Sequence, residues 1–235
     1  MPHGTTSARP GDLIKRLVPA SIAVAEGPIP DPGEPLWPEE FASVKDAVPK
    51  RVREFAAGRA FARRALLSLD VPLGPLPAKP DRSPRWPPGF AGSITHSSDY
   101  CAAAVARMTD ALAIGIDVED WDRFDPSLAA QIFSPDEMRM HVPGTAPREM
   151  RCLGALIFSA KEALYKCLSA VATVRLSFRD CTIELEREAA RFAMTVPAAA
   201  GIFATDRRID GRFAFAGSLV GTAVILPPTP RSAAG

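Results

Sequence analysis

The sequence predicts an α+β protein built from two similar halves, and two observations support this prediction. Residues 49–69 and 148–170 place apolar side chains three and four positions apart, which is the period of an amphipathic helix. Each of these segments is followed by short runs in which apolar and polar residues alternate, as they do in strands. The order helix, strands, helix, strands is typical of helices packed on antiparallel sheets.

Composition and charge exclude several classes of protein. The 235 residues carry 28 Lys and Arg against 27 Asp and Glu, and the net charge of +1 argues against a diffuse basic surface for nucleic acid. No uncharged apolar run approaches the roughly 20 residues that span a bilayer, and the first residues lack a signal-peptide pattern. We therefore expect no membrane span and a cytoplasmic protein. The four cysteines show no C-x-x-C spacing, which argues against a zinc site or a disulfide framework.

Proline is clustered rather than spread along the chain. Most of the 24 prolines fall in residues 28–38, 72–88 and 227–230. Because proline fixes φ and lacks an amide hydrogen, these stretches are expected to be extended connectors rather than helices or central strands. We expect an N-terminal subdomain over residues 1–110 and a C-terminal subdomain over residues 111–235.

The first half is expected to contain one helix and a small sheet. The helix should begin at Pro49, a residue that suits the first turn, and run to Leu69. Three runs with strand character follow, separated by short polar connections, and this arrangement predicts an antiparallel meander. The runs are residues 92–96, 100–106 and 112–119.

The second half is expected to contain two helices and a second sheet. Ser134 and Glu137 flank a proline in a capping box, so a helix should begin there. A longer helix is expected over residues 148–170. The remaining chain alternates with period two and predicts a second antiparallel sheet. Its expected strands are residues 182–187, 191–196, 202–206 and 212–226.

Two pairs of charged residues are candidates for chemistry. Asp117 and Glu119 lie two apart on an expected strand, so both carboxylates face the same side. Two such carboxylates repel each other and favour a divalent cation with a preference for oxygen, Mg²⁺ first. Glu162 and Lys166 lie four apart on the long helix and adjoin each other. Taken alone, the first pair is also typical of a solvated strand face, and the second of an exposed ion pair.

Cations in the first helix form a further candidate. Residues 50–64 hold six Lys and Arg residues, among them Arg51 and Arg63, with Glu54 as the only acid. Arg59 interrupts the apolar stripe, and a buried guanidinium needs either a carboxylate or a bound anion such as phosphate. His96 ends an expected strand; it is a structural residue unless other anion-binding groups converge on it.

The order of the motifs resembles the 4'-phosphopantetheinyl transferases, and within them the enterobactin synthase component D branch of the surfactin-type group. An arginine-rich helix is followed by W-P-P-G-F-A-G-S-I-T-H, then by G-I-D-V-E, then by F-S-A-K-E-A-L-Y-K. The resemblance spans residues 51–169, and the last two motifs discriminate best. It implies two α+β subdomains related by a pseudo-twofold axis, with coenzyme A bound between them. It also implies transfer of the 4'-phosphopantetheine arm of coenzyme A to a serine of an apo carrier protein, with release of adenosine 3',5'-bisphosphate.

The resemblance also implies roles for individual residues. Glu162 would accept the serine proton, and Lys166 would neutralise or protonate the leaving phosphate. Mg²⁺ would be held by Asp117, Glu119 and Glu162. The residues expected to bind coenzyme A are Arg51, Arg59, His96, Asp117 and Lys166, with either Lys79 or Arg82 in addition and Arg63 as a weaker candidate.

The resemblance implies an apo acyl or peptidyl carrier protein as the partner. Because carriers are usually acidic, we expect a locally basic, partly apolar surface that binds them. We place that surface at residues 124–140, and we expect a monomer. The physiological carrier and the choice between Mg²⁺ and Mn²⁺ stay open. Two other functions compete: a Mg²⁺-dependent phosphoesterase or nuclease using the same three acids, and a non-catalytic module that binds coenzyme A. A nucleic-acid-binding helix at residues 50–64 is disfavoured by the lack of aromatic residues beside it.

Overall fold

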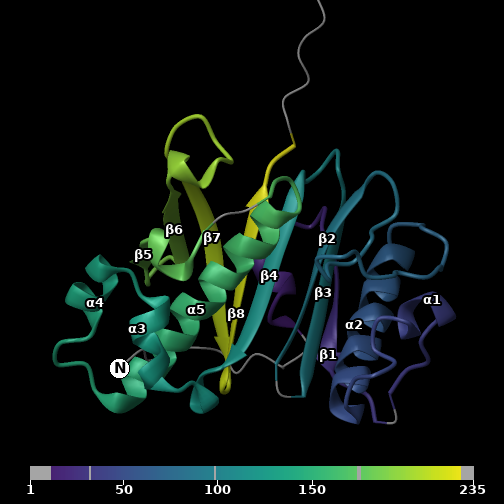
Figure 1. Cartoon of the computed structure of the whole chain (residues 1–235), viewed down its shortest axis with the longest axis horizontal. Coiled ribbons are helices and arrows are strands. Elements are labelled where there is room, and N and C mark those ends of the chain that lie inside the picture. Colours follow the sequence, from purple (N-terminus) through teal and green to yellow (C-terminus); the bar gives the residue numbers. More distant parts are fainter. Residues whose placement is uncertain (1–11, 32, 98, 174–175, 229–235) are drawn as a thin grey trace, which may run out of the picture.

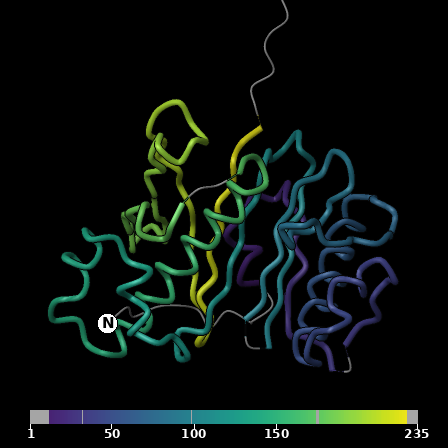
Figure 2. The backbone as a smooth tube through the Cα atoms, viewed as in Figure 1, coloured from purple at the N-terminus to yellow at the C-terminus, as the bar shows by residue number. Residues whose placement is uncertain are grey.

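Two antiparallel sheets stand side by side, each covered by a long helix (Figure 1). The structure is a computed structural model that describes residues 12–31, 33–97, 99–173 and 176–228. This arrangement confirms the predicted α+β class. Figure 2 follows the chain from the first sheet, in purple and blue, to the second, in green and yellow. None of the helices among the described residues is long and apolar enough to cross a membrane.

The first sheet has three strands in the order β1-β3-β2. Its strands are β1 (Ala23–Pro28), β2 (Phe90–Ser97) and β3 (Tyr100–Arg107), and the helices beside it are α1 (Pro38–Phe41) and α2 (Pro49–Leu67). α2 packs on β3, whose buried face carries Ala103 and Val105 against Ala57 and Phe61 of the helix. Small side chains on the central strand let the helix approach closely. The first turn of α2 places Arg51 beside His96, near the end of β2.

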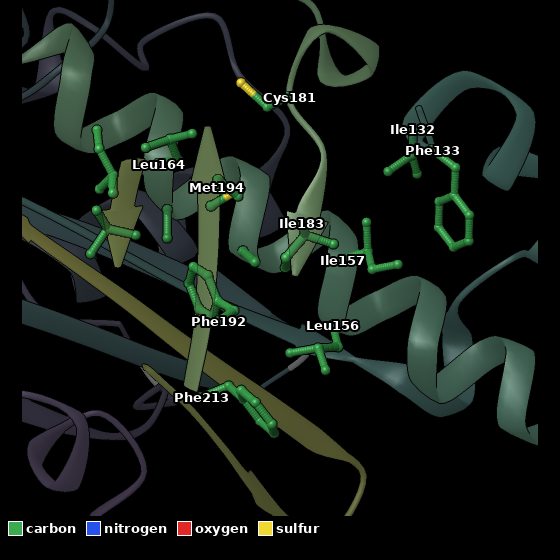
Figure 3. Close-up of a cluster of buried hydrophobic side chains, with 14 of the residues drawn as sticks. Ile132, Phe133, Leu156, Ile157, Leu164, Cys181, Ile183, Phe192, Met194 and Phe213 are labelled. Atoms are coloured by element: carbon green, nitrogen blue, oxygen red, sulfur yellow. The ribbon is translucent and has the colours of Figure 1, made fainter. Parts of the chain in front are cut away.

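The second sheet has five strands in the order β4-β8-β7-β6-β5. Its core is formed against one long helix, α5, by side chains that include Leu156, Leu164, Phe192 and Met194 (Figure 3). The strands are β4 (Ala113–Asp120), β5 (Ile183–Glu186), β6 (Arg191–Val196), β7 (Arg207–Ala216) and β8 (Leu219–Leu226), and the helices are α3 (Ala129–Ile132), α4 (Pro135–His141) and α5 (Pro147–Ser169). The predicted capping box at the start of α4 is confirmed, because Ser134 and Glu137 each bond the other's backbone amide.

The predicted meander in the first half is wrong. β2 and β3 do form a hairpin, but β4 pairs with β8 in the second sheet. β4 nevertheless lies beside β2, where the Ser93 and Thr95 hydroxyls accept hydrogen bonds from the amides of Ile116 and Val118, both at 3.1 Å. Side chains thus replace the backbone ladder between the two sheets. A short connection after β3 is compatible with either arrangement, which is why spacing alone favoured the wrong one.

The predicted strand at residues 202–206 is also wrong. This stretch forms bends after a turn of 3-10 helix at Ala198–Ala200, and Gly201 has the positive φ of 74° that ends that turn. β7 begins at Arg207, earlier than the expected start at residue 212, and turns into β8 at Gly217, where φ is 59°. The alternation of apolar and polar residues correctly predicted strand structure within β7 and β8, but it did not predict where β7 begins.

A segment before β1 was not predicted at all. Leu13, Ile14 and Leu17 are buried against β4 and β8 of the second sheet, although the segment precedes the first one. Glu26 on β1 fixes it by accepting hydrogen bonds from the amides of Ile14 (2.7 Å) and Lys15 (2.9 Å). The division into subdomains after residue 110 stays a prediction.

Candidate active site

The end of β4 lies directly beneath α5, and Gly115 makes this close approach possible. A Cβ atom added at Gly115 would lie 1.8 Å from the carbonyl oxygen of Ala163. Only a residue without a side chain fits there, because any Cβ would overlap the helix backbone. As a result, the turn of α5 that carries Glu162 and Lys166 sits over the strand end that carries Asp117.

A second contact fixes the helix along the strand. Thr222 on β8 lies opposite Asp117 in the sheet and donates a hydrogen bond to the carbonyl of Ser159 at 2.9 Å. The two hydroxyls of Ser159 and Thr222 are also 2.9 Å apart. Ser159 precedes Glu162 by about one helical turn, so this pair sets the position of Glu162.

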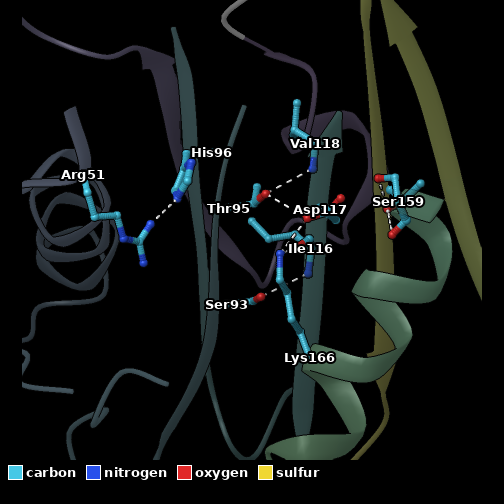
Figure 4. Close-up of polar contacts among 10 residues, drawn as sticks. Arg51, Ser93, Thr95, His96, Ile116, Asp117, Val118, Ser159 and Lys166 are labelled. Atoms are coloured by element: carbon cyan, nitrogen blue, oxygen red, sulfur yellow. Dashed lines mark hydrogen bonds and ion pairs between the residues drawn. The ribbon is translucent and has the colours of Figure 1, made fainter. Parts of the chain in front are cut away.

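Asp117 joins the two sheets and α5 at one point (Figure 4). Its Oδ1 accepts hydrogen bonds from Lys166 Nζ at 2.6 Å and from Thr95 Oγ1 on β2 at 3.1 Å. Its Oδ2 is buried and has no hydrogen-bond partner. Asp117 is only 4% exposed, so an unpartnered carboxylate oxygen there is costly and favours a bound cation.

Glu119 and Glu162 share the electrostatic environment of Asp117. Burial raises the pKa of Glu119 to about 8, helped by the charges of Asp117 and Glu162 and opposed by Lys166. Burial also raises the pKa of Glu162, which Lys166 lowers and the charge of Asp117 raises. The carboxylates predicted to work together are therefore close enough to repel one another, and a positive charge among them would relieve that repulsion.

The donor set fits a hard cation such as Mg²⁺. Carboxylate oxygens are the ligands that this ion prefers, and Asp117 Oδ2 has no hydrogen-bond partner that a cation would have to displace. Within the described ranges, no three His, Cys, Asp or Glu side chains already form a metal-binding group. At Asp117, Oδ1 is already paired with the Lys166 ammonium at 2.6 Å, which leaves Oδ2 for a cation.

Arg51 and His96 meet at the neighbouring edge of the first sheet. Arg51 Nη1 lies 2.9 Å from His96 Nε2, and Glu54 Oε2 lies 4.0 Å from the other ring nitrogen. Because arginine can only donate, Nε2 is the acceptor and the imidazole is neutral in this contact. Burial lowers the pKa of His96, which also favours the neutral ring. The charge of Glu54 opposes this shift, and the charges of Arg51 and Lys166 add to it. Lys166 is therefore close enough to His96 for its charge to lower the pKa of the imidazole, so the carboxylate site and the Arg51–His96 pair lie near each other.

Arg59 is buried and partly satisfied by the protein itself. Its Nε donates to the Leu76 carbonyl at 2.6 Å, and its guanidinium lies 4.1 Å from the centre of the Phe55 ring. Burial lowers its pKa to about 10, against the opposing charge of Glu40. Its Nη2 has no hydrogen-bond partner. Nη2 is therefore left without a partner inside the protein, while Nε binds the connector that follows α2.

The other cations lie farther out on the first half. Arg63 forms a 2.7 Å ion pair with Glu40, a fully buried acid on α1. Glu40, which lies just after the proline-rich stretch of residues 28–38, was not recognised in the sequence. Lys79 and Arg82 are exposed on a hairpin closed by the bridge between Ala78 and Pro84. The hairpin leaves both cations exposed to solvent.

A buried pair beside the site was also missed. Lys161 on α5 and Glu137 on α4 form an ion pair of 2.6 Å, with side chains 2% and 0% exposed. Lys161 interrupts an apolar stripe four residues after Ile157 and three before Leu164, as Arg59 does in α2. That interruption was a signal available in the sequence.

One cavity adjoins these residues. It has a volume of about 300 Å³, and its lining includes Glu162, Lys161, Tyr165 and Phe178. Larger hollows lie away from the carboxylates, the first of them, about 630 Å³, between Leu17 and the β5–β8 strands. The smaller cavity is the one that shares a residue with the candidate site.

Comparison with known proteins gives the family. The 4'-phosphopantetheinyl transferase N-terminal domain matches residues 38–106, and the 4'-phosphopantetheinyl transferase superfamily matches residues 113–212. The 4'-phosphopantetheinyl transferase Svp of Streptomyces mobaraensis is 37% identical over 221 residues, covering 90% of this chain and 88% of the relative. PptT of Mycobacterium tuberculosis is 34% identical over 182 residues, covering 76% and 79%.

The protein that gives the predicted branch its name is also among the similar proteins. Enterobactin synthase component D of Salmonella typhimurium is 34% identical over 137 residues, which cover 57% of this chain and 55% of the relative. These matches, together with the contact of Asp117 with Lys166 and Thr95 where the two sheets and α5 meet, lead to one conclusion. The chain belongs to the 4'-phosphopantetheinyl transferase superfamily and is an enzyme of that family.

Proposed function

We propose that this enzyme transfers the 4'-phosphopantetheine arm of coenzyme A to a serine of an apo acyl or peptidyl carrier protein. The products are the holo carrier and adenosine 3',5'-bisphosphate, and the reaction depends on Mg²⁺. The observation that supports this most is the contact of Asp117 with Lys166 and Thr95, which places an anionic and a cationic group together at the meeting of both sheets. Transfer at a pyrophosphate needs both kinds of group at one place.

Glu162 is the residue we assign to the serine proton. It lies half-buried on α5, lines the 300 Å³ cavity, and burial raises its pKa above that of an ordinary glutamate. A raised pKa makes a carboxylate a stronger proton acceptor near neutral pH. The serine oxygen then forms a bond to the β-phosphorus, and the bond from that phosphorus to the bridging oxygen of the α-phosphate breaks.

The leaving phosphate needs positive charge as this bond breaks. Lys166 Nζ is bound to Asp117 and is partly exposed, so it can turn toward a phosphate oxygen. Arg51 and His96 offer donors from the first sheet and α2, and Arg59 retains one free nitrogen. We propose that these groups bind the phosphates of coenzyme A, with Lys79 or Arg82 on the hairpin reaching the outermost one.

We propose Asp117, Glu119 and Glu162 as the Mg²⁺ ligands. When bound, the ion would offset the negative charge of the pyrophosphate. The residues themselves are positioned for this by Gly115 and by the pair of Ser159 and Thr222, which bring α5 onto β4.

Replacement of Arg51 tests the phosphate assignment. Arg51→Ala is expected to raise the Kd for coenzyme A by about 10- to 100-fold, the range for losing a hydrogen bond to a charged group. Titration calorimetry measures it. Lys50→Ala is the matched control, because Lys50 is a neighbouring exposed cation that also pairs with Glu54. Equal affinity of Arg51→Ala and wild type would remove Arg51 from the phosphate site.

Residues 124–140 are the surface we propose for the carrier. Leu128 and Met140 are exposed there, and Arg139 is an exposed cation paired with Asp136. Charge reversal in Arg139→Glu is expected to raise the apparent KM for an acidic carrier several-fold with little change in kcat. Arg208→Glu, which reverses an exposed cation on β7, serves as the control. An unchanged KM for the carrier would count against this surface.

The proposed activity is tested by incubating the enzyme with coenzyme A, Mg²⁺ and a panel of apo carriers, then weighing each carrier. The panel should include fatty-acid, polyketide and peptide-synthetase carriers. At least one carrier is expected to gain the mass of a single phosphopantetheine. If no carrier in the panel gains mass while the enzyme binds coenzyme A, the chain is instead a coenzyme A-binding module.

A further inference from the structure

Lys161 is fully engaged within the protein although it lies next to Glu162 in the chain. Its ammonium donates to the Ile132 carbonyl at 2.9 Å, to Glu137 Oε2 at 2.6 Å and to the Phe178 carbonyl at 2.7 Å. These acceptors use all three donors of a lysine. They lie at the end of α3, at the first turn of α4, and in the turn of 3-10 helix at Phe178–Asp180. One buried side chain of α5 therefore ties three separate segments to the helix.

Glu137 completes the connection from the other side. Its Oε2 also accepts the Ser134 amide at 2.6 Å, and its Oε1 accepts the Ile183 amide at 2.6 Å at the start of β5. The capping residue of α4 is therefore shared with α5 and with the second sheet. Removing either partner would leave the other charge buried and unpaired, which costs more than removing both.

The tied segments form one side of the site. Gln131, Ser177, Phe178 and Cys181 line the 300 Å³ cavity together with Glu162. The same connection holds α4, which carries the exposed Met140 and Arg139 of the proposed carrier surface.

The coenzyme A side does not depend on this connection. Arg51 and His96 belong to α2 and β2, and Lys166 is held by Asp117 of β4. The three acceptors of the Lys161 ammonium, on Ile132, Glu137 and Phe178, belong to none of these elements. Loss of the Lys161–Glu137 pair should therefore weaken the use of the carrier and leave the binding of coenzyme A unchanged.

We propose that the Lys161–Glu137 ion pair positions the wall that receives the acceptor serine, and that Lys161 and Glu137 are positioning residues for the carrier substrate. This inference rests on the proposed function, since it assigns a role relative to carrier and coenzyme A. Lys161 holds the α3–α4 segment and residues 176–181 at a fixed distance from Glu162. When this wall is displaced, α4 moves with it, and α4 carries the exposed Arg139 and Met140 of the proposed carrier surface, so the carrier should dock more weakly.

The test compares the two substrates in the double variant Lys161→Met/Glu137→Gln, which removes both charges and leaves neither buried alone. The full chain is assayed with the apo carrier that the wild-type enzyme modifies fastest. We expect the KM for that carrier to rise about tenfold or more, while the Kd for coenzyme A stays within about twofold. A merely structural role would lower the folded fraction, and so the apparent kcat, without changing either constant.

Glu40→Gln is the matched control, because it disrupts the other buried ion pair, Arg63–Glu40 at 2.7 Å, on the far side of the molecule. It should destabilise the protein and leave the KM for the carrier unchanged.

If the double variant does not fold, Lys161→Arg is the decisive variant. Arginine keeps the positive charge but cannot donate to the same three acceptors in the same geometry, so it should also raise the KM for the carrier. A folded variant with a wild-type KM for the carrier overturns the inference. Absence of any transfer by the wild-type enzyme overturns the proposed function instead.

Discussion

Glu162→Gln is expected to slow transfer of the arm by about 10²- to 10⁴-fold, the range that a positioned general base contributes. Glutamine keeps the size of the side chain but cannot accept the serine proton. It also removes one of the carboxylates whose mutual repulsion raises the pKa of Glu119, so the loss combines proton transfer and cation binding. Affinity for coenzyme A should change little, because Arg51, His96 and Lys166 are left in place.

The measurement is the initial rate of holo carrier formation at saturating coenzyme A, with the Kd for coenzyme A determined on the same preparation. Glu149→Gln is a suitable control on the same helix, because Glu149 is 58% exposed and lies 3.8 Å from its partner Arg187. It should retain wild-type activity. Turnover by Glu162→Gln within a few-fold of wild type would remove Glu162 as the base.

Gly115→Ala is expected to give the second large effect. The added Cβ would lie 1.8 Å from the Ala163 oxygen and 2.7 Å from the Cys167 nitrogen, so α5 or β4 must shift. Both contacts are to backbone, and overpacking that moves backbone costs about 1–3 kcal/mol or more. Because Glu162 and Lys166 flank Ala163 on α5, the same shift should move them away from Asp117 and reduce activity in the molecules that stay folded.

Denaturant unfolding and the activity per folded molecule together measure this effect. The matched control is Gly74→Ala, since a Cβ at Gly74 meets no atom within 4 Å and its φ is ordinary. The control should lie within about 0.5 kcal/mol of wild type. Wild-type stability and activity of Gly115→Ala would show that the approach of α5 to β4 does not hold the site together.

The sequence predicted the long helices well because their periodicity is strong and their starts carry proline. α2 was expected from Pro49, where it begins, and α5 from residue 148, one residue after Pro147. The partner of β4 was not predictable in this way. β4 is buried on both faces, so its pattern does not show which strand it pairs with, and β8 and β2 are separated from it in the chain by very different distances.

The candidate carboxylates and Lys166 were recognised from their motifs, whereas their supports were not. Thr95 and Thr222 are ordinary polar strand residues in the sequence, and their contacts to Asp117 and Ser159 depend on how the two sheets and α5 meet. Arg59 shows the opposite case. Its place on an apolar stripe was noticed, but the Leu76 carbonyl that accepts its hydrogen bond comes from a connector whose path is not visible in local spacing.

The most direct measurement follows both products of one reaction. Wild-type enzyme and Glu162→Gln are incubated side by side with coenzyme A, Mg²⁺ and the preferred apo carrier, and the carrier mass and released adenosine 3',5'-bisphosphate are quantified. We expect the wild-type reaction to add one phosphopantetheine per carrier with one equivalent of the bisphosphate, and the Glu162→Gln reaction to leave the carrier in its apo form. A carrier that stays apo with the wild-type enzyme, or one that is converted equally fast by both proteins, would contradict the account.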